Sequence, residues 1–221
     1  MAAGADGITA HLREDRRHIS DDDIARLRRD IDRPLNFEMA ATDEMLGIAL
    51  AHRPHAACLV PEKREERTTE GGLDVVRGQG HLARYVRELS AAGIRVSLFI
   101  EPDAAALDTA SALGAPVVEL HTGAYCHAWL DDPNGARVRQ ELARIVAAAA
   151  HAARIGLECH AGHGLTFDTV APVAAIVSMA ELNIGHFLIG EAIFGGLDSA
   201  VRRMRSLMDQ ARAAATAAGP A

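Results

Sequence analysis

Short apolar runs alternate with longer segments in which apolar residues recur at helical spacing, and this alternation continues along the whole chain. The apolar runs predict strands at residues 7–12, 35–40, 56–61, 95–101, 116–122, 157–162 and 181–186. The segments between them predict helices at 21–31, 43–53, 81–93, 103–113, 135–155, 168–177 and 198–214. Strands that alternate with helices in this way indicate a parallel sheet joined by right-handed helical crossovers.

Local signals fix several boundaries of these elements. Ser20 and Asp23 form a capping box at the start of the first helix, and Thr42 is the expected N-cap of the second. Residues 62–80 show neither the apolar run of a strand nor the helical spacing of apolar residues. We expect them to form the longest irregular segment, and loops of this kind are usually functional.

The strand count and strand character favour one fold class. Several strands are nearly continuous apolar runs, as expected where both faces of a sheet are covered. The fold class is therefore α/β, a (β/α)8 TIM barrel of which seven of the eight strands are recognised in this chain. A doubly wound open sheet would normally carry a glycine-rich turn after its first strand, and none is present. The 221 residues fit one domain, 1–221.

Composition narrows the class of protein. The formal net charge of −7 argues against nucleic-acid binding, which needs a clustered basic face. The three cysteines are widely spaced and are expected to be reduced, as in a cytoplasmic protein. The sequence shows no apolar run long enough for a membrane helix and no signal-peptide pattern, so we expect no membrane association.

Ionisable side chains stand at the ends of the predicted strands, where barrel enzymes place their chemistry. His11 ends the first strand, and Arg13 lies two residues on, on the same face of an extended segment. A histidine suited to proton exchange beside an arginine suggests an anionic substrate. Glu38 stands between Phe37 and Met39 on an apolar strand, where burial would raise its pKa into the range of a general acid or base. The alternative for Glu38 is a buried ion pair with an arginine.

A second group of candidates lies near the C-terminal end of the sheet. Gly162 and Gly164 flank His163, so the backbone can approach a ligand closely at this turn. His160 and His163 raise the possibility of a metal site, but no cysteine or carboxylate cluster completes a ligand set, and we predict no metal.

Two segments offer donors for phosphate groups. Gly185 and His186 open a short helix whose free N–H groups and dipole favour an anion, as after the last strand of many barrels. The alternative is an apolar helix that closes the end of the barrel. Thr68, in the irregular segment, offers a hydroxyl donor for a second anion.

These residues stand in seven segments that together resemble the pyridoxine 5′-phosphate synthase family of deoxyxylulose-dependent vitamin B6 synthesis. The segments are AGADGITAHLREDRRHI, NFEMA, CLVPEKREERTTEGGLDV, VSLFIE, VELHTGAY, HAGHGLT and ELNIGHFLIGEAIFGGL. The resemblance runs from residue 3 to about residue 208. It implies a TIM barrel that condenses 3-amino-2-oxopropyl phosphate with 1-deoxy-D-xylulose 5-phosphate. The products are pyridoxine 5′-phosphate, phosphate and water, and no metal or organic cofactor is implied.

The resemblance also implies roles for individual residues. His11 and Glu38 would act as proton acceptors and His163 as a proton donor, with Glu119 in a supporting role. The deoxyxylulose phosphate would be held by Arg13, His18 and Thr68. The aminoacetone phosphate would be held by Gly164, Gly185 and His186. The family assembles into octamers, so we expect a homo-oligomer.

The chain departs from the family at its N-terminus. Family members open with a first strand and helix carrying a motif like NIDHVATLRNAR that contacts the substrates, and nothing here corresponds to it. We therefore expect a truncated chain with low stability and reduced or no activity when taken alone. Two alternatives remain: a subunit that binds phosphosugar without turnover, and another phosphosugar aldolase or isomerase. The second would usually need a Schiff-base lysine or metal ligands, and the only lysine is Lys63, in a charged loop.

Overall fold

The computed structural model describes residues 2–62 and 71–218, and these divide into two compact units. The N-terminal unit comprises residues 6–101 and 105–119. The C-terminal unit comprises residues 120–221 together with the short segments 1–5 and 102–104. Each unit is described separately below. Whether the chain is one domain stays a prediction.

Seven strands follow one another in the sheet in the order in which they occur in the chain. They are β1 (Ile8–His11), β2 (Leu35–Met39), β3 (Ala56–Leu59), β4 (Arg95–Ile100), β5 (Val117–His121), β6 (Glu158–Gly162) and β7 (Met179–Asn183). Neighbours from β1 to β4 pair in parallel, as do β6 and β7. This topology confirms a TIM-barrel-like α/β fold with seven strands among the described residues.

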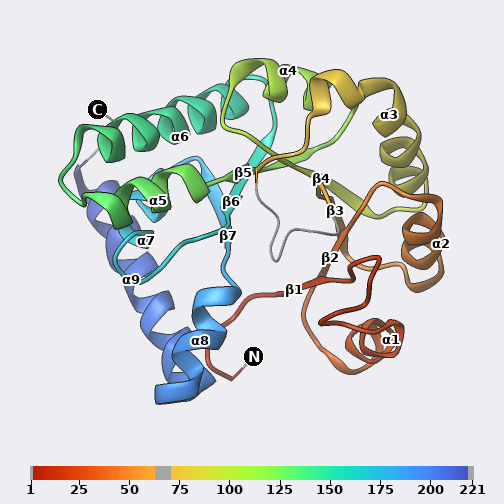
Figure 1. Ribbon diagram of the computed structural model, residues 1–221, viewed down its shortest axis with the longest axis horizontal. Coiled ribbons are helices and arrows are strands. Elements are labelled where there is room, and N and C mark those ends of the chain that lie inside the picture. Colours follow the sequence, from red (N-terminus) through yellow and green to blue (C-terminus); the bar gives the residue numbers. More distant parts are fainter. Residues whose placement is uncertain (1, 63–70, 219–221) are drawn as a thin grey trace. The chain divides into compact units, whose positions relative to one another are not determined.

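Helices of the N-terminal unit run beside strands β1 to β4 (Figure 1). They are α1 (Asp21–Asp30), α2 (Asp43–His52), α3 (Val75–Ala91) and α4 (Ala104–Ala112). The capping box of Ser20 and Asp23 and the Thr42 cap are both present, as predicted. The prediction of an irregular segment through residue 80 was wrong, because α3 begins at Val75 behind an Asp74 side chain that accepts the N–H of Arg77.

Strand β2 shows how the fold separates core from site. Leu35, Phe37 and Met39 are buried, whereas Asn36 and Glu38 alternate with them on the other face. The two-residue period of a strand therefore places the core residues on one side and the carboxylate of Glu38 on the other.

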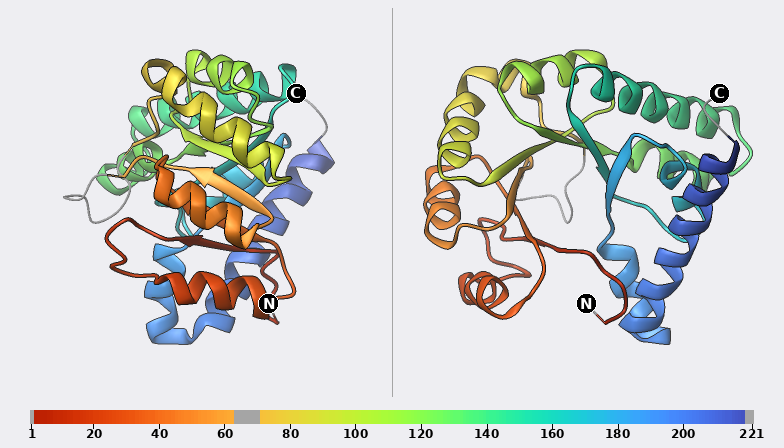
Figure 2. Two further views of the ribbon diagram at one scale, coloured as in Figure 1. Left: turned by 90° about the vertical axis from the view of Figure 1, so that its right-hand side faces the viewer. Right: turned by 180° about the vertical axis from the view of Figure 1, so that it is seen from behind.

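The C-terminal unit is built mainly from helices around β6 and β7, and the 180° view of Figure 2 shows α9 running beside α8. Its helices are α5 (Gly123–Asp131), α6 (Ala136–Arg154), α7 (Val170–Ala174), α8 (His186–Gly195) and α9 (Leu197–Ala218). The sequence interpretation did not include α5, which begins on a glycine and has no side-chain cap. Among the described residues, no helix combines the length and the apolar character needed to cross a membrane.

Arg212 ties α9 to the segment that joins α7 to β7. Its guanidinium donates to the carbonyl oxygens of Ala174 at 2.9 Å, Val177 at 3.0 Å and Met179 at 2.6 Å. Because a half-buried charged donor that satisfies several carbonyls is worth more than a surface pair, Arg212→Met should lower the free energy of unfolding by about 2–3 kcal/mol.

Urea unfolding checks this expectation, with Arg205→Met as the matched control. Arg205 lies on the same helix and forms an exposed pair with Asp209, so its loss should cost about 0.5 kcal/mol. Equal losses in the two variants would show that the three carbonyl contacts do not anchor the helix.

Candidate active site

His11 and Glu38 lie side by side on adjacent strands of the N-terminal unit. The parallel register of β1 and β2 pairs the two residues directly. The Nδ1 atom of His11 is 3.8 Å from Oε2 of Glu38, and their side chains are only 18% and 22% exposed. The two residues predicted as proton acceptors are therefore brought together at one end of the sheet.

Burial shifts both groups toward their neutral forms. Desolvation raises the pKa of Glu38 from 4.5 to about 7. Desolvation, followed by the charge of Arg13, lowers the pKa of His11 from 6.5 to about 4. Near pH 7 the imidazole is therefore neutral, and Glu38 is poised to take or return a proton. Among the described residues, the titratable side chain that faces the Glu38 carboxylate is His11 rather than an arginine.

Arg13 is buried beside this pair, with 4% of its side chain exposed. Its Nε atom lies 3.5 Å from Oδ1 of Asp15 and 3.8 Å from Oε1 of Glu62. The sequence interpretation did not single out Glu62, which stands in a run of charged residues. His18 is exposed, and its charge is near enough to contribute to the lowered pKa of His11.

Glu119 lies near Glu38 because both carboxylates neighbour the Cys58 thiol. The Cys58 thiol donates to Oε2 of Glu119 at 3.9 Å, and Glu119 is only 3% exposed. Desolvation raises the pKa of the Cys58 thiol, and the carboxylates of Glu119 and Glu38 raise it further. Cys58 is therefore a protonated thiol rather than a nucleophile, while Glu119 adds an acidic side chain near Glu38.

His163 occupies a tight turn at the end of β6 in the C-terminal unit. His163 and Gly164 both have positive φ angles, of 78° and 85°. The Thr122 hydroxyl stabilises this turn because it lies 2.8 Å from the carbonyl oxygen of Gly162 and 2.6 Å from that of His163. His163 therefore has a left-handed backbone conformation that non-glycine residues rarely adopt, and its imidazole projects from this turn.

The electrostatic surroundings of His163 are dominated by burial and other histidines. Desolvation is the largest cause that lowers its pKa to about 4, followed by the charges of His121, His127 and His186. The rings of His121 and His163 are tilted against each other with centroids 4.9 Å apart. Gly123 makes room for this contact, since a Cβ there would lie 2.4 Å from Nε2 of His121.

The structure places the remaining predicted residues as follows. Gly185 and His186 are exposed at the start of α8, and Gly185 supplies no side-chain cap, so the first N–H groups of the helix are available to an anion. Thr68 lies outside the described residues. His160, considered above with His163 as a metal ligand, instead pairs with Glu158 at 2.7 Å. Within residues 2–62 and 71–218 no cluster of side chains suits a metal ion.

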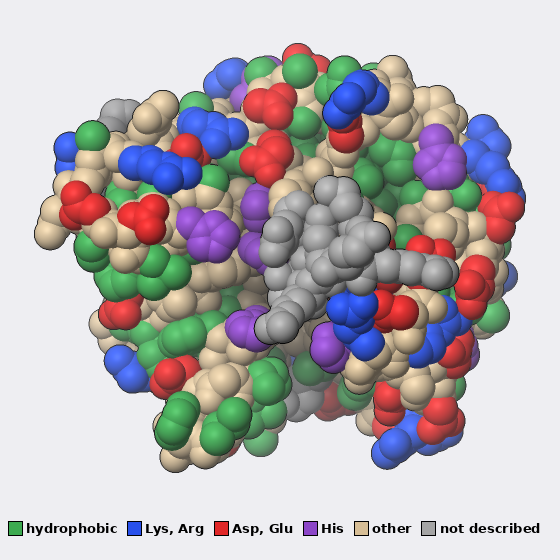
Figure 3. Space-filling view, in the orientation of Figure 1, with side chains coloured by type: hydrophobic (Ala, Val, Ile, Leu, Met, Phe, Trp, Pro, Cys, Tyr) green, Lys and Arg blue, Asp and Glu red, His purple; other side chains and the backbone are tan. Residues whose placement is uncertain are grey.

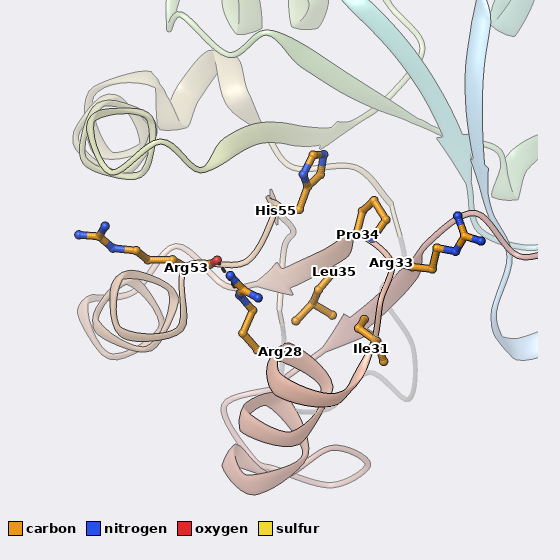
Figure 4. Close-up of a pocket in the computed structure, with 7 residues that line it drawn as sticks. All are labelled: Arg28, Ile31, Arg33, Pro34, Leu35, Arg53 and His55. Carbon is orange, nitrogen blue, oxygen red and sulfur yellow. Dashed lines mark hydrogen bonds between the residues drawn. The ribbon is translucent and has the colours of Figure 1, made fainter.

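A cavity of about 290 Å³ lies at the opposite end of β2, away from Glu38. Its lining residues are Arg28, Ile31, Arg33, Pro34, Leu35, Arg53 and His55. The Arg33 and Arg53 side chains point away from each other (Figure 4), so they do not converge on one ligand position. The cavity is therefore not part of the candidate site.

Comparisons with known proteins bear on what these groups do. A family model described as "Pyridoxal phosphate biosynthesis protein PdxJ" matches residues 1–210. The pyridoxine 5′-phosphate synthase of Rhodospirillum rubrum is 71% identical over 209 residues, which cover 95% of this chain and 82% of that protein. The enzyme of the same name from a Jannaschia species is 61% identical over 210 residues, covering 95% of this chain and 84% of that protein.

Among solved structures, the BexX/CysO complex of Amycolatopsis orientalis is similar in fold. The match has a TM-score of 0.64 at 18% identity and covers 100% of this chain and 84% of the other. At this level of identity the likeness concerns the fold alone.

Proposed function

The chain belongs to the PdxJ family of pyridoxal phosphate biosynthesis proteins, and from this premise we propose that it acts as a pyridoxine 5′-phosphate synthase. It would condense 3-amino-2-oxopropyl phosphate with 1-deoxy-D-xylulose 5-phosphate and release phosphate and water. The observation that supports this most strongly is the His11–Glu38 pair, whose members stand 3.8 Å apart with pKa values of about 4 and about 7.

The reaction needs several groups that can both accept and return protons. An amine condenses with a ketone, water and phosphate leave, and a carbon nucleophile closes the ring. In our proposal Glu38 and His11 accept protons during these steps, because at pH 7 the His11 imidazole is neutral and about half of Glu38 is in its carboxylate form. Glu119 supports them by placing a second carboxylate near Glu38.

Two phosphorylated substrates require two anion sites. Arg13, His18 and Thr68 would hold the deoxyxylulose phosphate, and the buried guanidinium of Arg13 is its strongest donor. Gly164 would contact the aminoacetone phosphate at the turn after β6, and Gly185 with His186 would bind its phosphate group at the start of α8.

His163 is the proposed proton donor, and its lowered pKa fits that role only with substrate bound. In the unliganded protein its imidazole is neutral at pH 7. A phosphate dianion bound beside it would favour the protonated form, since an opposite charge within a few ångströms raises a histidine pKa. Substrate binding would thus prepare the acid that the later steps use.

We also propose that the protein needs no cofactor, is cytoplasmic and forms a homo-oligomer. We expect no metal or organic cofactor, because the chemistry consists of proton transfers and condensations. Three buried, unpaired cysteines support a reducing, cytoplasmic location. A homo-oligomer is supported by the family and by exposed apolar side chains on α8, where Ile193 is 79% and Phe194 88% exposed. Figure 3 shows hydrophobic side chains at the lower left of the view, where Figure 1 places α8.

The test is to incubate the purified protein with both phosphorylated substrates, and with each alone, and to detect pyridoxine 5′-phosphate by mass spectrometry. We expect product only when both substrates are present. The same assay is run on a chain extended at its N-terminus with a first strand and helix that carry the family motif NIDHVATLRNAR. Absence of product from both forms would refute the proposed function.

A further inference from the structure

Glu62 is a buried carboxylate that none of the roles above uses. It follows β3, and its side chain is only 2% exposed. Its Oε1 atom accepts the backbone N–H of Glu14 at 2.8 Å. This hydrogen bond attaches Glu62 to the loop after β1, and therefore fixes its position relative to His11.

The other oxygen of Glu62 faces the His11 ring. Oε2 lies 3.4 Å from Nε2 of His11, and both atoms are buried. Neither atom makes a hydrogen bond with a described group, the other member of the pair included. On the far side of the ring, Nδ1 lies 3.8 Å from Oε2 of Glu38. The imidazole therefore has one carboxylate opposite each of its two nitrogens.

The charges around this arrangement are balanced. Arg13 lies 3.8 Å from Oε1 of Glu62, so the buried carboxylate has a cation beside it. Among the described residues, the other charged or titratable groups near His11 or Glu62 are Glu38 on β2 and Asp15, Arg17 and His18 in the loop after β1. Of the two carboxylates opposite the ring, Glu62 has the guanidinium beside it, whereas burial favours the protonated form of Glu38.

We infer that Glu62 is a positioning residue that holds His11 as the tautomer with its proton on Nε2. A neutral imidazole carries one N–H, and an anionic carboxylate opposite one nitrogen favours the proton at that nitrogen. The lone pair of Nδ1 then faces Glu38. This inference rests on the proposed role of His11 as a proton acceptor, because the lone pair on Nδ1 would be the accepting atom.

The test compares Glu62→Gln, Glu62→Asp and the parent protein by 15N NMR of the histidine side chains at pH 6, where His11 is neutral and Glu38 is mostly protonated. His11 signals are assigned by their loss in His11→Gln. The glutamine keeps the shape of Glu62 and an oxygen for the Glu14 N–H, but its amide can donate to Nε2. We expect the His11 proton to move from Nε2 to Nδ1 in Glu62→Gln and to stay on Nε2 in Glu62→Asp.

Activity provides the second measurement. A wrong tautomer should lower kcat by about 10²–10³-fold in Glu62→Gln, with a smaller change in KM and partial recovery in Glu62→Asp. Glu101→Gln is the matched control for the NMR experiment, because Glu101 also accepts one backbone N–H, from Gly72 at 2.9 Å. It should leave the His11 tautomer unchanged.

Two results would overturn the inference: an unchanged His11 tautomer in Glu62→Gln, or a changed tautomer with the kcat of the parent. A lower melting temperature of Glu62→Gln with an unchanged His11 tautomer would also overturn the inference, since it would show that Glu62 has a purely structural role. If neither the parent nor its N-terminally extended form makes product, the proposed function fails, and the NMR signals alone decide whether Glu62 orients His11.

Discussion

Glu38→Gln should lower kcat by about 10²–10⁴-fold in the two-substrate assay, the largest loss of activity that we expect from a single change. The amide keeps the shape of the side chain but cannot accept and return the proton that passes through this carboxylate. Glu88→Gln is the control, because Glu88 forms a surface pair with Arg84 on α3 and should have no effect on the rate. A Glu38→Gln enzyme with the kcat of the parent would contradict the assignment of Glu38.

The pH dependence of the parent's activity should follow the ionisation of the Glu38 carboxylate. The pKa of Glu38 is raised to about 7, so the accepting carboxylate form grows as pH rises through 7. His11 and His163 are already neutral there, with pKa values of about 4. We therefore expect kcat/KM to rise about tenfold per pH unit below 7 and to level off above it. This rise should be absent in the residual activity of Glu38→Gln.

Stability should change with pH through Glu38 as well. Between 4.5 and about 7 the folded protein keeps a proton that the unfolded chain has lost. The stability that this proton contributes is fully present below pH 4.5 and is lost as pH rises through about 7, by ~3 kcal/mol. His11 acts in the opposite direction, since its contribution is present above 6.5 and lost as pH falls through about 4.

The difference between Glu38→Gln and the parent isolates the contribution of Glu38, because His11 is present in both. Urea unfolding should show the variant gaining about 2 kcal/mol relative to the parent between pH 5 and pH 8. A difference that is the same at both pH values would show that desolvation of Glu38 does not affect folding.

Gly72→Ala should destabilise the fold by about 3 kcal/mol, the largest stability effect that we expect from adding one methyl group. A Cβ at Gly72 would lie 2.3 Å from the backbone nitrogen of Glu101 and 2.5 Å from the carbonyl carbon of Ile100. The backbone approaches closely here because the next residue, Leu73, donates its N–H to the carbonyl oxygen of Phe99 at 2.7 Å. The clash is with the backbone, so no side-chain rotation relieves it.

Gly80→Ala provides a control of opposite sign. Gly80 is exposed within α3, and a Cβ there meets nothing within 4 Å. Replacing a glycine inside a helix by alanine should stabilise the protein by about 0.5–1 kcal/mol. Urea unfolding followed by circular dichroism measures both variants. Equal stabilities of Gly72→Ala and the parent would show that the segment moves away from β4 at little cost.

The strands were predictable because their apolar runs are short and separated by clear helical spacing. The start of α3 was missed for a physical reason: Gly78 and Gly80 lower helix propensity and obscure the spacing of Val75 and Leu82. Helix α5 was missed because its first turn carries no capping side chain, and its N-cap, Thr122, instead bonds to the turn after β6.

Part of the site was predictable from the sequence, and Glu62 shows why another part was not. His11 and Glu38 stood out because each interrupts an apolar strand, and the register of β1 and β2 brings them together. Glu62 carried no such signal, because a glutamate among charged residues normally faces water. Only the fold reveals that its carboxylate turns back onto the Glu14 N–H and the His11 ring. The roles of the site residues stay predictions until the variants are measured.

Strand β5 belongs to both compact units, since the boundary falls between Glu119 and Leu120. Glu119 meets Cys58 in one unit, and His121, two residues on and on the same face of the strand, meets His163 in the other. A shift of β5 by a single residue would turn both side chains to the opposite face at once. A one-residue insertion or deletion in β5 ahead of Glu119 would therefore disturb the contact of Glu119 with Cys58 and the ring contact of His121 with His163 together.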